Sequence, residues 1–598
     1  MGKLLGLRMV VMALLLAGAG AQSQEGANNV SDKVDASGRI RIGYYPKAFA
    51  GKQLTDLKKI ESSLSQWLLS QNSKLTAENF ELRNVRESLT AKHFYFQQKQ
   101  DGLVVESAEV IVSVDNSTQE MYRIFDNSTE SKPAVAKAGS QLTSEKAVDI
   151  AWKHIWVSGR LLADVKSEKL FIEQDGTLRL TYRVEIDTVE PAGSWEVILD
   201  AYTGEIVRTQ DLRKDAKHDD SKPVFGRTPG KKLLDYREAV KALDAKKSIS
   251  LLSNGNRRDA TALVFDPDPR TTLTDNTLLD SSPKSAFEPA YKSVVLKDVT
   301  EVAGVLKLSG PWVTLVDFEA PVNTPYTVQN GEFKGKRGDQ SFNDAMTYYH
   351  LDKNQRYMQS LGFFGSRGIQ YLSITVDSNG ANGADNSYYR PSANHLAFGW
   401  GCVDDNEDAD VILHEYNHAI NHSINSNFSG GDTGAMGEGF GDYWAQSYSI
   451  STENGMTFNP FHVFNWDAHS DPNNEEGCWP GRRLDKTQAQ YVHSQNYYAH
   501  SRHDSFVSDE LWSTPIFQAL YEAVKTKQAT REEMDRIILE AQFGLGYGLK
   551  MRDMANSIVS NAKRLYPQGK HAEIYARKFA AQNIIERQSS LVPLAKAN

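Results

Sequence analysis

Residues 414–418 read His-Glu-Tyr-Asn-His, a spacing that can bind a metal ion and activate water. The stretch from Asp408 to Ser423 contains neither Gly nor Pro, so we predict a helix there. On such a helix His414 and His418 lie about 6 Å apart along the axis on one face, where two imidazoles can bind one zinc ion. Glu415, beside the first of them, is then placed to act as general base on a zinc-activated water.

A third ligand is expected from another segment. His422 lies on the same face but about 12 Å along the axis from His414, which is too far for a shared ion. Glu438 lies 20 residues after the second histidine, beyond a glycine-rich stretch that lets the chain return. Two imidazoles and one carboxylate leave the fourth position of a zinc ion open. Asp442, one helical turn after Glu438, is placed to accept the second ring N–H of a ligand histidine.

These motifs belong to the second part of a chain with α+β organisation. Apolar residues at helical spacing predict helices at 54–69 and 142–155, and each is followed by short alternating stretches typical of antiparallel strands. Lys214 to Lys222 is charged and lacks large apolar residues, which predicts an exposed, protease-sensitive linker. A strand-rich stretch follows, then helical patterns at 342–361 and over most of the chain from residue 408. We therefore expect two helix-plus-antiparallel-sheet modules, a strand-rich lobe and a helical lobe, with the zinc helix between the lobes.

Composition excludes several classes of protein. The chain is 40% hydrophobic and 24% charged, as in soluble globular proteins, and has a formal net charge of −9. Residues 1–21 read as a secretory signal, with Lys3 and Arg8 before an apolar stretch and Ala19-Gly20-Ala21 as cleavage site. Removal of those two cations lowers the charge to −11, which disfavours nucleic acid as a partner. After the signal no apolar run reaches the ~20 residues of a membrane span.

Export also bears on the only two cysteines, Cys402 and Cys478. In an exported protein they can form a disulfide, or they can remain two reduced, buried thiols. We expect a secreted protein, either extracellular or periplasmic, and the sequence does not choose between these two compartments.

The chemistry-bearing segments, His414–His418 and Gly434–Asp442, resemble the gluzincin metallopeptidases, specifically the fungalysin and thermolysin families. The resemblance extends to Asn386-Ser387-Tyr388-Tyr389 and to His395–Gly399, which are similar to the segment and edge strand that hold substrate in thermolysin-like enzymes. An edge strand can bind an extended peptide by strand addition. The resemblance implies that Asn386 bonds the substrate backbone and that Ser387 offers a carbonyl to the leaving amine.

The N-terminal part carries a resemblance of its own. His93–Gln97 with Gly102–Val105 resembles the fungalysin/thermolysin propeptide motif, and Trp195–Ile206 resembles a PepSY module. This implies an inhibitory, chaperone-like prosegment that is removed near residues 213–223. The expected division is a signal peptide at 1–21, a fungalysin/thermolysin-type propeptide at 22–135, a PepSY-like module at 136–212, a processing linker at 213–224 and a thermolysin-like catalytic domain at 225–598.

The sequence also departs from these families. No Tyr lies between His418 and Glu438, so the oxyanion-stabilising tyrosine of thermolysin is absent there and Tyr497 or Tyr498 would have to replace it. The proton-donating histidine of the family precedes a late helix. We assign that role to His503, shortly before the helix start at 507–513, with His500 as the alternative.

Two further positions concern metal binding and charge. Asp410, one turn before His414, matches a thermolysin calcium ligand, but the carboxylates expected after Asp442 are absent, so the sequence does not complete a Ca²⁺ site. Arg482 and Arg483 can reach a substrate carbonyl or form salt bridges, and we favour the salt bridges.

The sequence thus predicts a secreted zinc endopeptidase made as a zymogen, with its own propeptide as intramolecular inhibitor and with protein or peptide substrates. Two alternatives remain open. One is a zinc- and peptide-binding protein without turnover, against which the intact Glu415 argues. The other is a narrow-specificity processing peptidase on the same fold. No Gly-x-Ser-x-Gly elbow supports a serine hydrolase.

Overall fold

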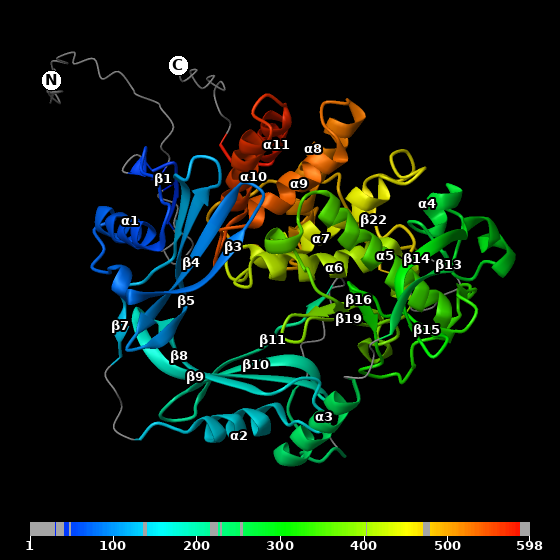
Figure 1. Cartoon of the computed structure of the whole chain (residues 1–598), viewed down its shortest axis with the longest axis horizontal. Coiled ribbons are helices and arrows are strands. Elements are labelled where there is room, and N and C mark those ends of the chain that lie inside the picture. Colours follow the sequence, from blue (N-terminus) through cyan, green and yellow to red (C-terminus); the bar gives the residue numbers. More distant parts are fainter. Residues whose placement is uncertain are drawn as a thin grey trace, which may run out of the picture.

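The computed structural model describes residues 30–31, 41–46, 49–134, 140–215, 225–227, 230–250, 255–401, 403–469 and 479–586. The predicted signal peptide, the two cysteines and linker residues 216–224 lie outside the described residues. No helix among the described residues is long and apolar enough to cross a membrane. The architecture is mixed, with helices and several sheets (Figure 1).

One 11-stranded sheet contains the strands of both predicted N-terminal modules. Its order is β1-β2-β6-β5-β8-β9-β10-β11, with β3 and β4 continuing beside β5 and with β7 beside β9. Parallel pairs join the two halves: Val105 lies opposite Phe171, and β7 places Lys132 opposite Thr177 and Pro133 opposite Leu178. The strands are β1 (Val30–Ser31), β2 (Arg41–Tyr44), β3 (Phe80–Glu87), β4 (Ala91–Gln100), β5 (Leu103–Asp115), β6 (Met121–Asp126), β7 (Lys132–Pro133), β8 (Lys166–Gln174), β9 (Thr177–Val189), β10 (Ala192–Asp200) and β11 (Ile206–Asp211).

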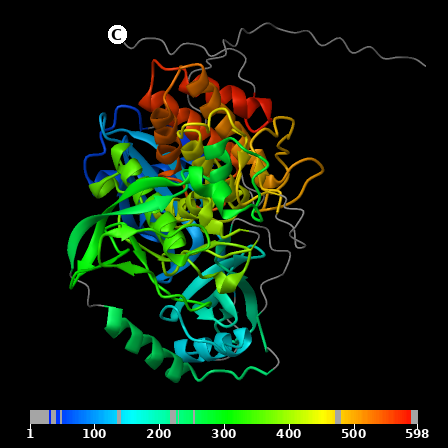
Figure 2. The same cartoon turned by 90° about the vertical axis from the view of Figure 1, so that its right-hand side faces the viewer.

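Each half of this sheet carries one helix, as the apolar spacing predicted. α1 (Leu57–Ser70) begins at Asp56, whose carboxylate accepts the Lys59 N–H at 3.1 Å. α2 (Ser144–Ile155) begins at Thr143, whose hydroxyl accepts a backbone N–H of the first turn in the same way. Both helices bury an apolar face against their strands. Figure 2 shows α2 and its strands at the bottom of the molecule, beside the helix of residues 236–250.

Two five-stranded sheets form the strand-rich part. The first has the order β17-β15-β14-β13-β18. Its strands are β13 (Asn256–Val264), β14 (Lys292–Val302), β15 (Val305–Lys307), β17 (Thr327–Val328) and β18 (Glu332–Phe333). The second has the order β12-β20-β21-β19-β16. Its strands are β12 (Lys214–Asp215), β16 (Val313–Leu315), β19 (Ile374–Asp377), β20 (Tyr388–Arg390) and β21 (His395–Ala397).

The described start of the predicted linker is paired as a strand, although Lys214 is exposed and Asp215 is only partly buried. Lys214 and Asp215 form edge strand β12 of the second sheet. A charged composition predicted an exposed linker, but strand pairing uses backbone N–H and C=O groups, which composition does not reveal.

The remaining helices follow in sequence, and α6 and α7 lie between the strand-rich part and the later helices (Figure 1). They are α3 (Tyr236–Ser250), α4 (Pro269–Leu273), α5 (Gln340–Ser360), α6 (Ala409–Ile424), α7 (Thr433–Ser449), α8 (Ser508–Lys525), α9 (Arg531–Gln542), α10 (Met551–Leu565) and α11 (His571–Ala581). The helices predicted at 342–361 and 408–423 are confirmed as α5 and α6. Between α7 and α8 the described chain is irregular, apart from the short hairpin of β22 (His462–Val463) and β23 (Arg482–Arg483).

Asp432 fixes the start of α7. This fully buried carboxylate accepts the Tyr491 hydroxyl at 2.7 Å, the Tyr497 N–H at 3.0 Å and the Met551 N–H at 3.1 Å, and Lys550 Nζ lies 3.2 Å away. It therefore ties α7 to the irregular stretch before α8 and to the start of α10.

We predict that Asp432→Ala lowers the free energy of unfolding by about 3–5 kcal/mol, because it leaves the buried ammonium of Lys550 without its charge partner and the Tyr497 and Met551 N–H groups without their acceptor. Chemical denaturation followed by tryptophan fluorescence measures the loss. Asp504→Ala, at an exposed position, is the control and changes stability by less than about 0.5 kcal/mol. Equal stability of the two variants would contradict the role of Asp432.

Candidate functional site

Three side chains from α6 and α7 converge as predicted. One ligand atom from each of His414, His418 and Glu438 lies within 4.8 Å of the other two, and all three residues are buried. His414 Nε2 is 3.2 Å from Glu438 Oε2, and His418 Nε2 is 3.4 Å from Glu438 Oε1.

This donor set fits a zinc ion. Two ligands about 2.0–2.1 Å from a tetrahedral ion lie about 3.3 Å apart, close to the two spacings observed here. His418 Nε2 is buried and makes no hydrogen bond to any described residue. Burial, which outweighs the opposing charge of Glu438 and is helped by the charges of His414 and Arg482, lowers the pKa of His418 to about 3. The ring is therefore neutral and has a lone pair for a metal.

Asp442 and Arg482 hold the first ligand. His414 Nδ1 lies 3.2 Å from Asp442 Oδ1, and Arg482 Nη2 lies 2.7 Å from the same oxygen. Burial disfavours the charged form of Asp442, but Arg482 and then His414 outweigh it and lower the pKa of that carboxyl. Arg482 is thus a salt-bridged residue, as favoured from the sequence, and Arg483 pairs with Asp485 at 2.5 Å.

Glu415 lies beside the cluster without a partner of its own. The residue is fully buried, and neither carboxylate oxygen makes a hydrogen bond to a described residue. Burial raises the pKa of Glu415 well above its usual range, and the nearby charges of Glu438, Asp215 and Asp405 raise it further. A carboxyl in such surroundings is suited to take up a proton.

His500, rather than His503, reaches this cluster. Its Nδ1 is 2.9 Å from Asp509 Oδ2, and its Nε2 is 3.7 Å from Glu438 Oε2. Burial disfavours the charged ring, but Asp509 and Glu438 outweigh it and raise the pKa of His500 to about 9. In turn, burial opposes ionisation of Glu438, but the imidazoles of His500, His418 and His414 hold the pKa of its carboxyl well below its usual range.

The structure places His503 and Tyr497 in other surroundings. The His503 ring stacks on Phe506 at 4.7 Å and contacts Tyr497 at 5.3 Å. The Tyr497 hydroxyl accepts the backbone N–H of Val492 at 3.0 Å, and the side chain of Tyr498 is 63% exposed. Among the described contacts none joins these three side chains to the metal-ligand cluster. The sequence contained one indication of His500, because its partner Asp509 lies at the start of the predicted late helix.

Strand β12 lies against the same cluster. In the antiparallel pair of β12 and β20, Lys214 lies opposite Tyr389 and Asp215 opposite Tyr388. The Asp215 carbonyl accepts from His500 Nε2 at 3.1 Å. β20 is therefore used for strand addition here, with a segment of the same chain as its partner.

Asn386 and Ser387 precede β20 beside this segment. Asn386 Nδ2 lies 3.5 Å from Asp215 Oδ2, and its Oδ1 accepts the backbone N–H of Ser387 at 3.0 Å. The Ser387 hydroxyl donates to Asp405 Oδ2 at 2.6 Å. Their roles toward a substrate stay predictions.

Asp410 is engaged by protein groups. It accepts the Ser449 hydroxyl at 2.5 Å and the Phe464 N–H at 3.0 Å. Within the described residues it belongs to no cluster that could hold a metal, and Ca²⁺ at this position stays a prediction.

Residues 141–210 match the protein family described as "Peptidase propeptide and YPEB domain", PepSY. The PepSY-like module expected from Trp195–Ile206 is thereby confirmed, and its bounds at 136–212 stay a prediction. The chain thus contains a domain of the kind found in peptidase propeptides.

The chain is also similar to bacillolysins. It is 33% identical over 138 residues to bacillolysin of Bacillus subtilis (strain 168), which covers 22% of this chain and 26% of that protein. It is 31% identical over 173 residues to bacillolysin of Bacillus amyloliquefaciens, which covers 26% of this chain and 32% of that protein. The chain therefore spans about a quarter to a third of the length of these curated relatives.

Two solved structures align with the chain at a distance. The precursor of protealysin, a metalloproteinase from Serratia proteamaculans, aligns with a TM-score of 0.31 at 13% identity over 46% of this chain and 87% of that chain. The C-terminal domain of YpeB from Bacillus megaterium aligns with a TM-score of 0.17 at 12% identity over 29% and 76%. Both scores are too low to support an argument, and the two-lobed thermolysin-like architecture stays a prediction.

We predict that the chain binds one zinc ion and that His418→Ala weakens binding more than about 100-fold, because even residues behind the ligands contribute 10–100-fold. The measurement is zinc per chain after dialysis against a competing chelator. His422→Ala is the matched control, since this histidine lies on α6 against Tyr389 instead of in the cluster. Equal loss of zinc in both variants would refute the ligand assignment.

Proposed function

We propose that the protein is a secreted zinc endopeptidase made as a zymogen. The observation that carries this proposal is the convergence of His414, His418 and Glu438 next to the partnerless carboxylate of Glu415. The PepSY match and the similarity to bacillolysins support a peptidase with a propeptide.

In this proposal the two histidines and Glu438 hold the ion, and Glu415 acts as general base. A bound zinc ion supplies Lewis acidity that polarises the scissile carbonyl and acidifies the attacking water. Glu415 takes a proton from that water and returns it to the leaving amine. Its buried position, free of other hydrogen bonds, leaves both oxygens available for these transfers.

His500 replaces His503 as the proposed oxyanion partner. Protonated on both nitrogens, it donates from Nδ1 to Asp509 and from Nε2 to the oxygen that gains charge. The Asp215 carbonyl, 3.1 Å from Nε2, occupies the position that a scissile carbonyl would take. Asp509 orients the ring and stabilises its charge.

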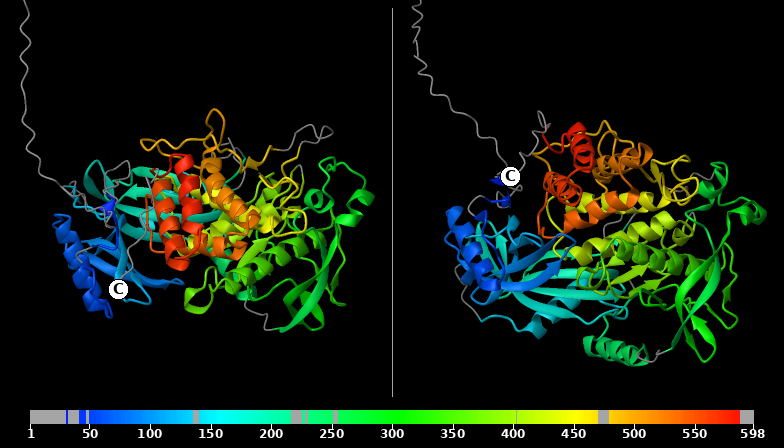
Figure 3. Two further views of the ribbon diagram at one scale, coloured as in Figure 1. Left: turned by 90° about the horizontal axis from the view of Figure 1, so that it is seen from above. Right: turned by 45° about the horizontal axis from the view of Figure 1, so that its top comes forward.

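The prosegment is proposed as the intramolecular inhibitor, and β12 supports this because it takes the edge of β20 that a substrate would pair with. A separate set of contacts joins the first half of the sheet to the C-terminal helices, seen in Figure 3 as blue strands beside red helices. Glu540 accepts the Ser88 hydroxyl at 2.8 Å and the Leu89 N–H at 2.9 Å. Arg123 donates to Ser557 at 2.7 Å and to the Phe543 carbonyl.

The expected division into 22–135, 136–212, 213–224 and 225–598 is part of the proposal, with processing in the linker. A cut there breaks the covalent link between β12 and the chain that follows it, while β12 stays attached to the chain that precedes it. The prosegment then stays bound through its contacts with the helices until it dissociates or is degraded.

We predict that the protein, once processed and zinc-loaded, cleaves casein. Glu415→Ala lowers kcat by at least about 10³-fold while zinc remains bound, because the attacking water loses its base. Proteolysis followed by gel electrophoresis and zinc analysis on the same samples tests this. Chelation abolishes activity, and added zinc restores it. No cleavage by a processed chain that holds one zinc would refute the endopeptidase and favour a binding protein or a narrow-specificity processing enzyme.

We further predict that Arg123→Ala shortens latency. With a specific protease site inserted within residues 216–224, activity appears after the cut about 10–100-fold sooner in the variant, because the buried bonds to Ser557 and Phe543 are lost. Arg179→Ala is the matched control, since Arg179 pairs with Asp200 and Glu205 inside the prosegment. The same delay in both variants would contradict the docking role of Arg123.

A further inference from the structure

Three carboxylates form a second cluster next to the proposed scissile position. One carboxylate oxygen from each of Asp385, Asp405 and Asp467 lies within 4.8 Å of the other two. Asp405 and Asp467 are fully buried, whereas Asp385 is exposed. Carboxylates this close repel one another, and a cation among them is stabilised.

The register of β12 shows which peptide residue would meet this cluster. Because Lys214 lies opposite Tyr389 and Asp215 opposite Tyr388, a peptide continuing in this register places its next residue opposite Ser387. Residues directly opposite in an antiparallel pair present their side chains on the same face. The Ser387 hydroxyl reaches Asp405 at 2.6 Å, so the peptide side chain opposite it faces the acidic cluster.

The carbonyl before that residue lies at the candidate catalytic site. The Asp215 carbonyl accepts from His500 Nε2, which is 3.7 Å from Glu438. The residue that faces the cluster is therefore the first one after the bond to be cleaved.

Glu415, the proposed base, is fully buried, and neither of its carboxylate oxygens makes a hydrogen bond to a described residue. Asp215 and Asp405 lie near enough to Glu415 for their charges to act on it, so the Asp405 end of the acidic cluster lies close to the proposed base.

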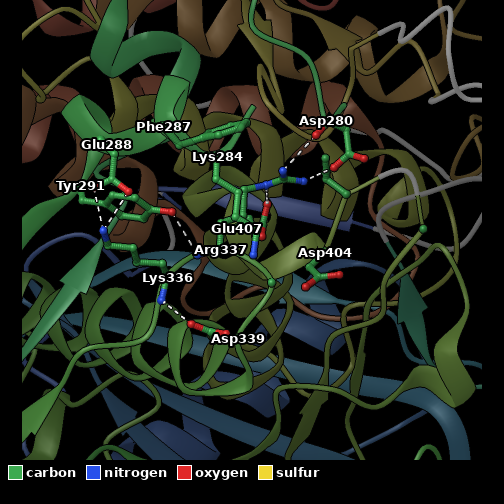
Figure 4. A pocket seen from close by; sticks show the side chains of 13 residues that line it. Asp280, Lys284, Phe287, Glu288, Tyr291, Lys336, Arg337, Asp339, Asp404 and Glu407 are labelled. Atoms are coloured by element: carbon green, nitrogen blue, oxygen red, sulfur yellow. Dashed lines mark hydrogen bonds and ion pairs between the residues drawn. The ribbon is translucent and has the colours of Figure 1, made fainter. Parts of the chain in front are cut away.

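Negative charge continues beyond the cluster into a pocket of about 440 Å³ (Figure 4). Five of the charged residues that line it are acidic and three are basic. Two of the basic ones are already paired, Lys336 with Glu288 at 2.7 Å and Arg337 with Glu407 at 2.7 Å. Gly401 connects the pocket with the acidic cluster. It lines the pocket, and it packs so closely on Asp385 that a Cβ at position 401 would lie 2.2 Å from the Asp385 carboxyl carbon.

We infer that this cleft selects peptides with Lys or Arg immediately after the scissile bond, and that Asp385, Asp405 and Asp467 bind that side chain. This inference rests on the proposed function and names the substrate class of the same site. A long basic side chain can place its charge among the three carboxylates while its stem packs beside the strand. An acidic side chain at this position is repelled.

The test uses the full chain expressed with a protease site inserted within residues 216–224, cut at that site, incubated until the prosegment has dissociated, and loaded with zinc. Three internally quenched peptides differ only in the residue after the scissile bond, which is Arg, Leu or Glu, and mass spectrometry fixes the bond cut. We expect kcat/KM for the Arg peptide to exceed that for the Leu peptide more than about tenfold, with the Glu peptide lowest, because the basic side chain forms a desolvated charge pair that Leu cannot form and Glu opposes.

The exposed Asp385 provides the variant least able to disturb folding. Asp385→Asn is expected to lower the Arg-to-Leu ratio of kcat/KM about tenfold. Glu453→Gln, which removes the same charge at an exposed position on the loop after α7, leaves that ratio unchanged. A ratio near one in the parent protein, or an equal ratio in both variants, overturns the inference while casein cleavage keeps the proposed function.

Two other outcomes distinguish failure of the proposed function from failure of this inference. If no peptide and no casein is cleaved, the proposed function fails, and binding of fluorescent Arg and Leu peptides to the zinc-loaded chain decides the inference, which equal affinities would overturn. If the chain binds one Ca²⁺ that is lost in Asp385→Asn and shows no peptide preference, the cluster is a cation site and the inference is wrong.

Discussion

The balance of buried charge around Arg482 is the constraint on which the candidate site depends. Its guanidinium lies 2.7 Å from Asp442, 3.7 Å from Glu438 and 3.8 Å from Asp509. Buried carboxylates are costly unless a cation compensates them, and one arginine serves all three. Arg482 belongs to β23, and its guanidinium lies over the rings of Phe464 and Trp479. The stretch between α7 and α8 therefore places this positive charge in the protein interior. Without it, Asp442 would lose the cation nearest to it, and Asp509 would keep only the charge of His500.

A second constraint is the exposed edge of β20, which has backbone groups that need a partner. In the chain described here β12 supplies it, and in the proposed reaction a substrate does. The two compete for the same hydrogen bonds, and covalent attachment gives β12 an effective concentration that a free peptide rarely reaches. In the proposed zymogen, latency therefore needs no distortion of the metal ligands. It needs only that β12 stay paired in the cleft while the first half of the sheet stays bound to the C-terminal helices.

The sequence predicted what helical geometry determines and missed what loops and backbone pairing determine. The positions of His414 and His418 follow from the period of α6, and Glu438 with Asp442 follows from that of α7. The choice between His500 and His503 depended on how an irregular stretch folds, and no periodicity constrains it. The strand at Lys214 and Asp215 was predicted as linker, because two residues carry no alternation. The few parallel pairs that merge the two N-terminal modules into one sheet are equally invisible in the sequence.

Two glycines on α7 allow α6 and α8 to pack closely against it. A Cβ at Gly441 would lie 2.5 Å from His414 Nδ1, and one at Gly439 would lie 2.8 Å from the Asp509 carbonyl oxygen. Each glycine inside a helix costs about 1 kcal/mol relative to alanine, so α7 gives up intrinsic stability at both positions. In return α6 and α8 approach it from two sides, and Glu438 lies between the histidine pair on one helix and the His500–Asp509 pair at the start of the other. The glycines in the motif around Glu438 thus set the distance at which three helices can share one cluster of charge.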